Sequence, residues 1–227
     1  MTVASETILP AAHEPRSLAE RAYRLLVRII TRLELAPGSL IVEKELTIRL
    51  GIGRTPVREA LQRLAIEGLV VHQPNRGMFV ADITTSGVQN IYEFRSMIDA
   101  HLVRLAAQRA STQQVRDLLR LHDRFIEASL ADEIDDYVEL DRSFYAILAA
   151  AAQNIYLTEA VPRIFHLHLR LWFYISVRRG GWQDVARAHA EMAGGVARAI
   201  SARDPDAAET AIKSYIARRH QDMRDLL

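Results

Sequence analysis

Turn-forming residues divide the first third of the chain into short segments, which is the feature that most restricts its fold. These residues are Pro37-Gly38, Gly51-Ile52-Gly53, Gly68 and Pro74–Gly77. Between the turns, apolar spacing and β-prone composition predict three helices and then two strands, at about 17–33, 42–50, 55–67, 69–72 and 78–81. Helix, helix, glycine turn, helix and hairpin is the order of elements in a winged helix-turn-helix.

The rest of the chain, from Thr84 onward, shows no further strand signal. Capping and breaking residues, among them Ser111-Thr112, Gly180-Gly181 and Asp204-Pro205, separate its apolar-periodic segments. The segments predict six helices, at about 86–109, 112–130, 135–151, 155–178, 182–202 and 206–224. The expected fold class is therefore mostly α, with an N-terminal winged helix-turn-helix and a C-terminal antiparallel all-α bundle.

The length of 227 residues suggests one large or two ordinary domains, and the composition is typical of a soluble globular protein. We expect a disordered leader at 1–16, a DNA-binding domain at 17–82 and a helical domain at 86–227 for effector binding and dimerisation. The chain has no cysteine, which excludes a disulfide framework, a cysteine nucleophile and a thiolate metal site. No apolar run approaches the ~18 residues that a membrane span needs. We therefore expect a cytoplasmic protein with no membrane partner.

Charge alone does not identify a nucleic-acid partner. Residues 1–80 carry eleven basic and eight acidic side chains, so the N-terminal part has a net charge of +3. The remaining residues carry eighteen basic and twenty acidic side chains, so that part has a net charge of −2. This mild asymmetry permits DNA binding by the first part but does not establish it.

The third expected helix has the chemistry of a DNA-reading helix. Arg54 and Arg58 are four residues apart and therefore share a face. An arginine fork suits the two acceptors of guanine, and Thr55 can reach a phosphate or a base. The apolar residues of this helix fall mainly on the other side and are expected to pack on the first two helices. A simpler alternative is that the arginines form solvated ion pairs along the helix, such as Arg58 with Glu59.

The run PGSLIVEKELTIRLGIGRTPVREALQRLAIEGLVVHQPNRGMFV resembles the GntR family of regulators nearly residue for residue. The resemblance covers about residues 17–82 and implies contacts with DNA at Lys44, Arg54, Thr55, Arg58, Asn75, Arg76 and Gly77. Gly53 departs from the family pattern, because many members have serine or threonine there. A dinucleotide-loop interpretation of Gly51 and Gly53 is weak, since no strand precedes them and the third glycine is missing.

Residues 86–224 resemble the six-helix effector domain, called FCD, of the fatty-acid-responsive branch of the same family. The runs EFRSMIDAHLVRLAAQRA, DRSFYAILAAAAQN and AISARDPDAAETAIKSYI carry this resemblance. In many relatives the domain holds a divalent metal with one aspartate and three histidines. Asp141 matches the aspartate, but Tyr145 and Tyr215 replace the first and last histidines. His189 lies about one turn before the position of the middle histidine.

Tyrosine hydroxyls are poor ligands for such metals, so we expect no metal and no cofactor. The alternative keeps a divalent metal by recruiting His189 and water. The resemblance aligns Arg95 with a position that faces the pocket in relatives and can bind an anionic effector. The alternative is that Arg95 forms an ion pair with Asp99. The expected effector-binding residues are Arg95, Asp141, Tyr145, His189 and Tyr215. Either His166 or His168 could also line the pocket, but residues two apart on a helix cannot share a face.

These features favour a ligand-responsive, DNA-binding transcription regulator. We expect a homodimeric repressor of a catabolic or transport operon, which binds a pseudo-palindromic double-stranded operator and senses a small carboxylate. The competing hypothesis is an enzyme with its active site in the polar cluster of the bundle. The sequence disfavours the enzyme, because it has no H-E-x-x-H motif, no glycine-flanked serine and no second carboxylate at a fixed spacing from Asp141.

Overall fold

A computed structural model describes residues 17–131 and 133–227, so the expected leader at 1–16 lies outside the described residues. The described chain packs as two compact units. The helical unit holds residues 92–161 and 181–221. The winged unit holds residues 162–180 and 222–227 together with the described residues up to Ile91.

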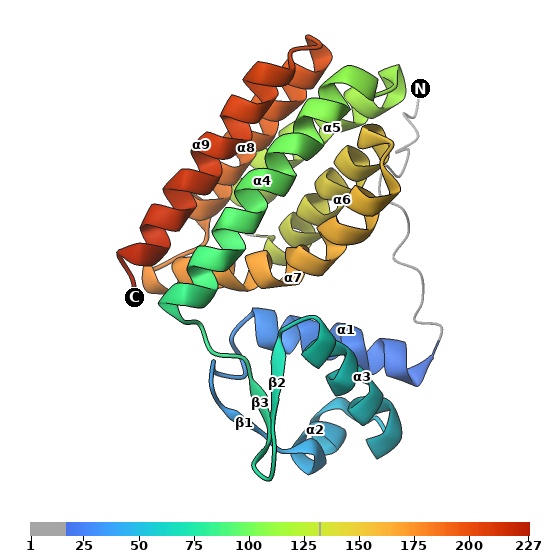
Figure 1. Cartoon of the computed structure of the whole chain (residues 1–227), viewed down its shortest axis with the longest axis vertical. Coiled ribbons are helices and arrows are strands. Elements are labelled where there is room, and N and C mark those ends of the chain that lie inside the picture. The colour runs from blue at the N-terminus through green and yellow to red at the C-terminus, as the bar shows by residue number, and fades with distance from the viewer. Residues whose placement is uncertain (1–16, 132) are drawn as a thin grey trace. The chain divides into compact units, whose positions relative to one another are not determined.

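The N-terminal part of the winged unit contains three helices and a hairpin in the predicted order, with one additional short strand (Figure 1). They are α1 Leu18–Thr31, β1 Leu40–Ile41, α2 Glu43–Leu50, α3 Arg54–Ile66, β2 Val70–Gln73 and β3 Gly77–Val80. The Ser17 side chain accepts a hydrogen bond from the Glu20 backbone N–H and caps α1. Gly51 ends α2 in the left-handed conformation, with φ of +63°, which glycine adopts without strain.

The strands form one antiparallel sheet in the order β1-β3-β2. β2 and β3 make the expected hairpin, shifted by one residue from the predicted bounds at each strand. β1 is an addition that the sequence did not predict. Its two residues pair with β3 through Leu40 opposite Phe79 and Ile41 opposite Met78.

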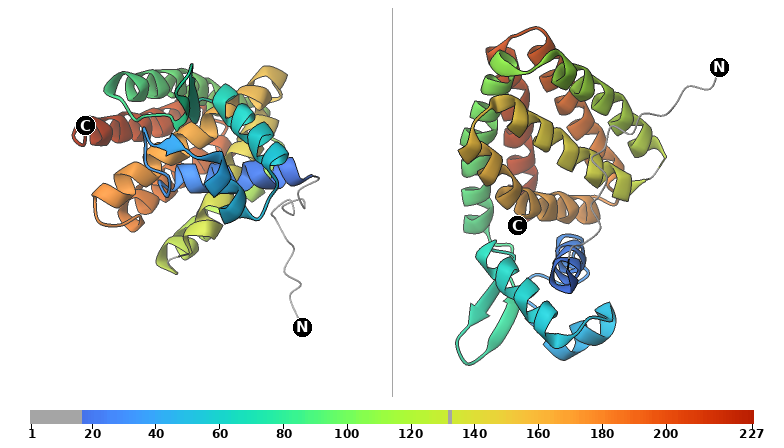
Figure 2. Two further views of the ribbon diagram at one scale, coloured as in Figure 1. Left: turned by 90° about the horizontal axis from the view of Figure 1, so that it is seen from below. Right: turned by 90° about the vertical axis from the view of Figure 1, so that its right-hand side faces the viewer.

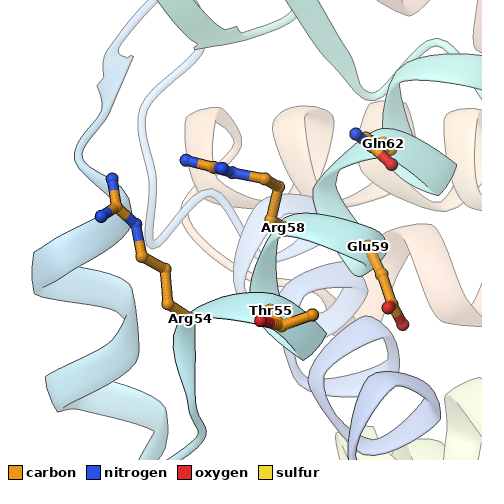
Figure 3. A pocket seen from close by; sticks show the side chains of 5 residues that line it. All are labelled: Arg54, Thr55, Arg58, Glu59 and Gln62. Carbon is orange, nitrogen blue, oxygen red and sulfur yellow. The ribbon is translucent and has the colours of Figure 1, made fainter.

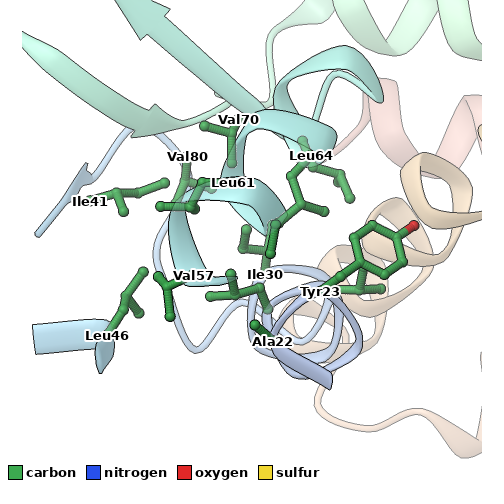
Figure 4. Close-up of a cluster of buried hydrophobic side chains, with 14 of the residues drawn as sticks. Ala22, Tyr23, Ile30, Ile41, Leu46, Val57, Leu61, Leu64, Val70 and Val80 are labelled. Carbon is green, nitrogen blue, oxygen red and sulfur yellow. The ribbon is translucent and has the colours of Figure 1, made fainter. Parts of the chain in front are cut away.

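A continuous hydrophobic core joins α3 to α1 and to the sheet. Figure 4 shows Val57, Leu61 and Leu64 pointing from α3 into this core. All three are fully buried, as is Ile30 of α1, while Val80 of β3 is 1% exposed. Complete burial of one such side chain contributes roughly 1.5–3 kcal/mol. Burial of this face fixes the orientation of α3 and leaves the opposite face in solvent.

The six predicted C-terminal helices are confirmed, with bounds that agree to within one residue. They are α4 Thr85–Arg109, α5 Thr112–Leu130, α6 Ile134–Ala152, α7 Ile155–Arg178, α8 Gln183–Ser201 and α9 Pro205–Arg224. Ser111 forms a capping box with Gln114, and the Asp204 side chain accepts from two backbone N–H groups at the start of α9. In the described residues, no helix is both long and apolar enough to cross a membrane.

Within the helical unit, α5 packs against α6 and α8. The helices α4 and α9 lie side by side in Figure 1 and in the right-hand view of Figure 2. Helices α5 and α8 approach closely where Gly194 faces the ring of His122. A Cβ atom on Gly194 would lie 2.5 Å from Cε1 of that ring, so glycine makes room for the histidine. The ring in turn places Nδ1 3.1 Å from the Ala190 carbonyl oxygen.

Candidate DNA interface and effector cluster

The exposed face of α3 presents the predicted DNA-reading residues together. Arg54, Thr55 and Arg58 line an open hollow with Glu59 and Gln62 (Figure 3). The Arg54 side chain is 74% exposed and that of Arg58 is 50% exposed, so both guanidinium groups are accessible to a partner. The first turn of a recognition helix is the part that meets base edges in a major groove.

One acidic side chain, which the sequence interpretation missed, contacts both arginines. Glu43 opens α2, and its Oε2 accepts from Arg58 Nη2 at 2.9 Å and from Arg54 Nε at 3.4 Å. Its Oε1 accepts from Arg58 Nε at 3.3 Å. The hydrogen bond from Arg58 is the main cause that lowers the pKa of Glu43 below its ordinary value. Arg58 thus pairs with Glu43 across two helices, and not with Glu59 along its own helix.

The other predicted DNA contacts lie on α2 and at the turn of the hairpin. Lys44 follows Glu43 on α2 and is exposed. Asn75 and Gly77 have positive φ angles of +61° and +101°, and this backbone conformation makes the turn tight. Arg76 is exposed between them, with its guanidinium carbon 5.8 Å from the centre of the Phe79 ring. The turn is therefore compact and basic.

The helical unit contains a buried polar cluster, and the first part of it is centred on Arg95 of α4. Arg95 and Asp99 are each 1% exposed and form an ion pair, with Nη2 and Nε of Arg95 at 2.7 and 2.9 Å from Asp99 Oδ2. Arg95 Nη2 also donates to the Tyr145 hydroxyl of α6 at 2.5 Å. Complete burial raises the pKa of Tyr145 well above its ordinary value, so this hydroxyl is neutral. The ion pair between Arg95 and Asp99 that the sequence allowed is therefore present, and Arg95 also donates to Tyr145, one of the predicted effector-binding residues.

The second part of the cluster joins α6 to α8 through Asp141 and His189. Tyr137 donates its one hydroxyl proton to the Ala186 carbonyl oxygen at 2.6 Å. The Tyr137 oxygen also lies 3.0 Å from Nδ1 of His189, which is a hydrogen-bond distance. Nε2 of the same ring lies 3.1 Å from Asp141 Oδ1, so the two side chains join α6 to α8 at ion-pair distance.

Four buried atoms of this cluster have no hydrogen-bond partner among the described residues. They are Arg95 Nη1, Asp141 Oδ1, His189 Nε2 and the Tyr215 hydroxyl oxygen. The contact between Asp141 and His189 is at ion-pair distance but does not have the geometry of a hydrogen bond. The Tyr215 ring of α9 lies 5.6 Å from the His189 ring, centre to centre. Buried polar groups are nearly always satisfied, so these four atoms need partners that the described residues do not supply.

The donor set does not fit the metal that the family resemblance implies. Asp141 and His189 supply one carboxylate and one imidazole, whereas Tyr145 and Tyr215 supply neutral hydroxyls. No group of three or more His, Asp or Glu residues that could hold a metal ion is found in the part of the chain that the structure describes. His166 and His168 belong to the stretch of α7 that packs with the winged unit, where His166 Nδ1 lies 3.4 Å from the Glu67 carboxylate.

Comparisons with known proteins agree with both halves of this description. Residues 18–80 match the bacterial regulatory proteins of the gntR family, and residues 90–218 match the FCD domain. The HTH-type transcriptional repressor RspR of Escherichia coli (strain K12) is 28% identical over 208 residues, which are 91% of this chain and 89% of that protein. The Nta operon transcriptional regulator of Aminobacter aminovorans is 36% identical over 131 residues, which are 56% of this chain and 60% of that protein.

Solved structures show the same fold. The Escherichia coli McbR/YncC structure has a TM-score of 0.77 at 21% identity and covers 92% of this chain and 98% of that chain. A putative transcriptional regulator GntR from Rhodococcus sp. RHA1 has a TM-score of 0.70 at 21% identity, with the same two coverages. The relatives named here are regulators, so they support a regulator and not an enzyme. The chain belongs to the GntR family of bacterial transcription regulators, and its C-terminal part is an FCD domain.

Proposed function

We propose that the chain is a homodimeric repressor that binds a pseudo-palindromic operator through α3 and the β2–β3 turn. The observation that carries this proposal is the pair of accessible arginines, Arg54 and Arg58, on the first turns of α3. Two such helices in a symmetric dimer would read two half-sites about one helical turn of DNA apart. Lys44, Thr55 and the wing residues Asn75, Arg76 and Gly77 would contact the backbone or a groove nearby.

Its effector is a small carboxylate that binds in the polar cluster without a metal ion. The free Nη1 of Arg95 would donate a charge-assisted hydrogen bond to the carboxylate. A hydroxyl on the same ligand would donate its one proton to Asp141 Oδ1, next to Nε2 of His189. The Tyr215 hydroxyl would complete the ligand's contacts. The operon is one for catabolism or transport of this carboxylate.

The DNA assignment is tested with an operator selected from a random pool by the parent protein. Arg54→Ala and Arg58→Ala should each cost about 1–3 kcal/mol in binding and relax specificity at one base position. Lys44→Ala should weaken binding equally on all sequences, because phosphates carry no sequence information. Operator affinity that is unchanged in both arginine variants would show that α3 is not the reading helix.

The effector assignment has a matched pair of variants in Tyr215→Phe and Tyr156→Phe. The Tyr215 hydroxyl has no partner among the described residues, so its removal should leave the melting temperature of the free protein unchanged. A panel of small carboxylates and hydroxycarboxylates should raise the parent's melting temperature, and Tyr215→Phe should reduce that increase. Tyr156 is 79% exposed, so Tyr156→Phe should behave as the parent does. Equal ligand shifts in both variants would contradict the assignment.

Two further measurements test the metal and the assembly. Elemental analysis after mild purification should find no stoichiometric transition metal. Zinc or nickel at one equivalent, lost on Asp141→Ala or His189→Ala, would refute the metal-free cluster. Light scattering should give twice the 25.6 kDa mass of one chain. A monomer at micromolar concentration would contradict the symmetric dimer that the palindrome requires.

A further inference from the structure

Glu43 engages the two arginines that the proposed function assigns to base reading. Figure 3 shows the Arg54 and Arg58 side chains pointing to one side of α3, while Glu59 points to the other. On that side, the carboxylate of Glu43 receives two hydrogen bonds from Arg58 and one from Arg54. The Glu43 side chain is 22% exposed, much less than either arginine, so the carboxylate is the better-fixed member of the group.

The contact between Glu43 and Arg58 is a fork, in which two nitrogens of one guanidinium meet both oxygens of one carboxylate. Such bidentate pairs fix the plane of the guanidinium as well as its position. A phosphate accepts the same fork that a carboxylate does, and so do N7 and O6 of guanine. Glu43 engages Nε and Nη2 of Arg58, so a ligand that takes this edge of the guanidinium must replace Glu43, and a ligand at the remaining Nη1 binds next to a negative charge.

The two possible DNA ligands differ in how they tolerate that charge. A phosphate is itself negative, so it is repelled by the carboxylate that it displaces. A guanine edge carries no net charge, and it offers acceptors in the geometry that the fork already holds. Non-specific binding depends on phosphate contacts, whereas specific binding adds the base contacts. Glu43 should therefore weaken non-specific DNA binding more than specific DNA binding.

We propose that Glu43 is a specificity-determining residue. It keeps Arg54 and Arg58 from binding phosphates but allows them to bind base edges. This inference rests on the proposed DNA contacts of the two arginines. It adds to them an acidic side chain that does not touch DNA itself and that lowers affinity for the wrong sequences.

Glu43→Gln in the full-length chain provides the test, because glutamine keeps the size of the side chain and removes its charge. Binding is measured on the selected operator and on a random-sequence duplex of equal length, at several salt concentrations. Affinity for the random duplex should rise, and its salt dependence should steepen by about one unit on a log–log plot as one more phosphate is contacted. The ratio of operator to random affinity should fall at least about fivefold, the lower end of what one bidentate base contact contributes.

Glu45→Gln is the matched control. Glu45 lies in the same first turn of α2, is exposed, and has the same charge, but it makes no ion pair with either arginine among the described residues. Its replacement should change both affinities by the same factor and leave their ratio intact. If Glu43→Gln melts at a lower temperature than Glu45→Gln, Glu43→Asp keeps the charge and shortens the reach. The affinity ratio should then fall in the aspartate variant as well.

An unchanged ratio in Glu43→Gln, or equal ratios in Glu43→Gln and Glu45→Gln, would overturn the inference. The Arg58→Ala variant separates this failure from failure of the proposed function. If Arg58→Ala weakens operator binding while Glu43→Gln leaves the ratio unchanged, only the role of Glu43 is wrong. If Arg58→Ala and Arg54→Ala bind as the parent does, the assignment of α3 is wrong and the role of Glu43 fails with it.

Discussion

Replacing Arg95 with methionine should destabilise the helical unit more than replacing a surface arginine with methionine does. Methionine keeps most of the apolar length of arginine but removes the donors that lie 2.7 and 2.9 Å from Asp99 Oδ2. Asp99 is 1% exposed and cannot recover those contacts from water. Its only other donor among the described residues is the Tyr145 hydroxyl, at a long 3.4 Å.

Removing one partner of a buried ion pair costs about 3–5 kcal/mol, because the other charge remains buried without compensation. Each kcal/mol lowers the melting temperature by roughly 2–4 °C in domains of 150–250 residues and by more in smaller ones, so Arg95→Met should melt at least roughly 6 °C lower. Replacing both partners, as in Arg95→Met with Asp99→Leu, should recover most of the loss. Apolar residues of similar volume often replace a buried pair at little net cost.

Urea unfolding followed by tryptophan fluorescence measures these differences, because Trp182 packs on the Tyr137 ring of the same unit, 5.5 Å between centres. Arg142→Met serves as the control, since Arg142 pairs with Glu139 at 3.5 Å and both are about half exposed. That surface pair should contribute less than about 1 kcal/mol. The reasoning is refuted if Arg95→Met costs no more than the control, or if the double variant is no more stable than the single one.

Three further changes test other parts of the structure. Leu61→Ala, in the core of the winged unit, should cost about 2–5 kcal/mol in urea unfolding, and a loss below that of a surface Leu→Ala change would contradict the packing described. Tyr137→Phe should lower the free energy of unfolding by about 1–3 kcal/mol in calorimetry, because it removes the hydroxyl next to Nδ1 of His189. A Tyr137→Phe variant as stable as the parent would contradict this prediction. Gly194→Ala should lower the melting temperature, because its methyl group would clash with the His122 ring. Combining it with His122→Ala should recover part of this loss, and additive losses in the double variant would contradict the clash.

Local signals explain why so much of the fold could be predicted. The helices from α4 to α9 have long apolar periods and clear breaks, and their predicted bounds agree with the structure. Strand β1 had no such signal, because its two residues, Leu40 and Ile41, are too few to show alternation. It forms only because β3 offers a free edge, which is a property of the folded sheet and not of the segment itself.

The candidate sites show the same division between local and long-range information. Asp141 and Tyr145 are four residues apart on one helix, so their proximity follows from sequence spacing. Tyr137 has the same spacing to Asp141, and this signal could have identified it. Glu43 is fifteen residues from Arg58 and on a different helix, so their contact depends on how α2 packs against α3.

The short strand β1 has a consequence for how the wing can evolve. β1 pairs with β3 at Met78 and Phe79, and residues 73–77, which connect β2 to β3, have no partner in β1. The turn needs a residue that tolerates positive φ at position 75 and a glycine at position 77, whereas Arg76 is exposed and lies 5.8 Å from the centre of the Phe79 ring. Substitutions there leave the sheet's hydrogen bonds unchanged. In the proposed mode of DNA binding, substitutions at position 76 would change the preference for the DNA that flanks the operator without altering the fold or the contacts of α3.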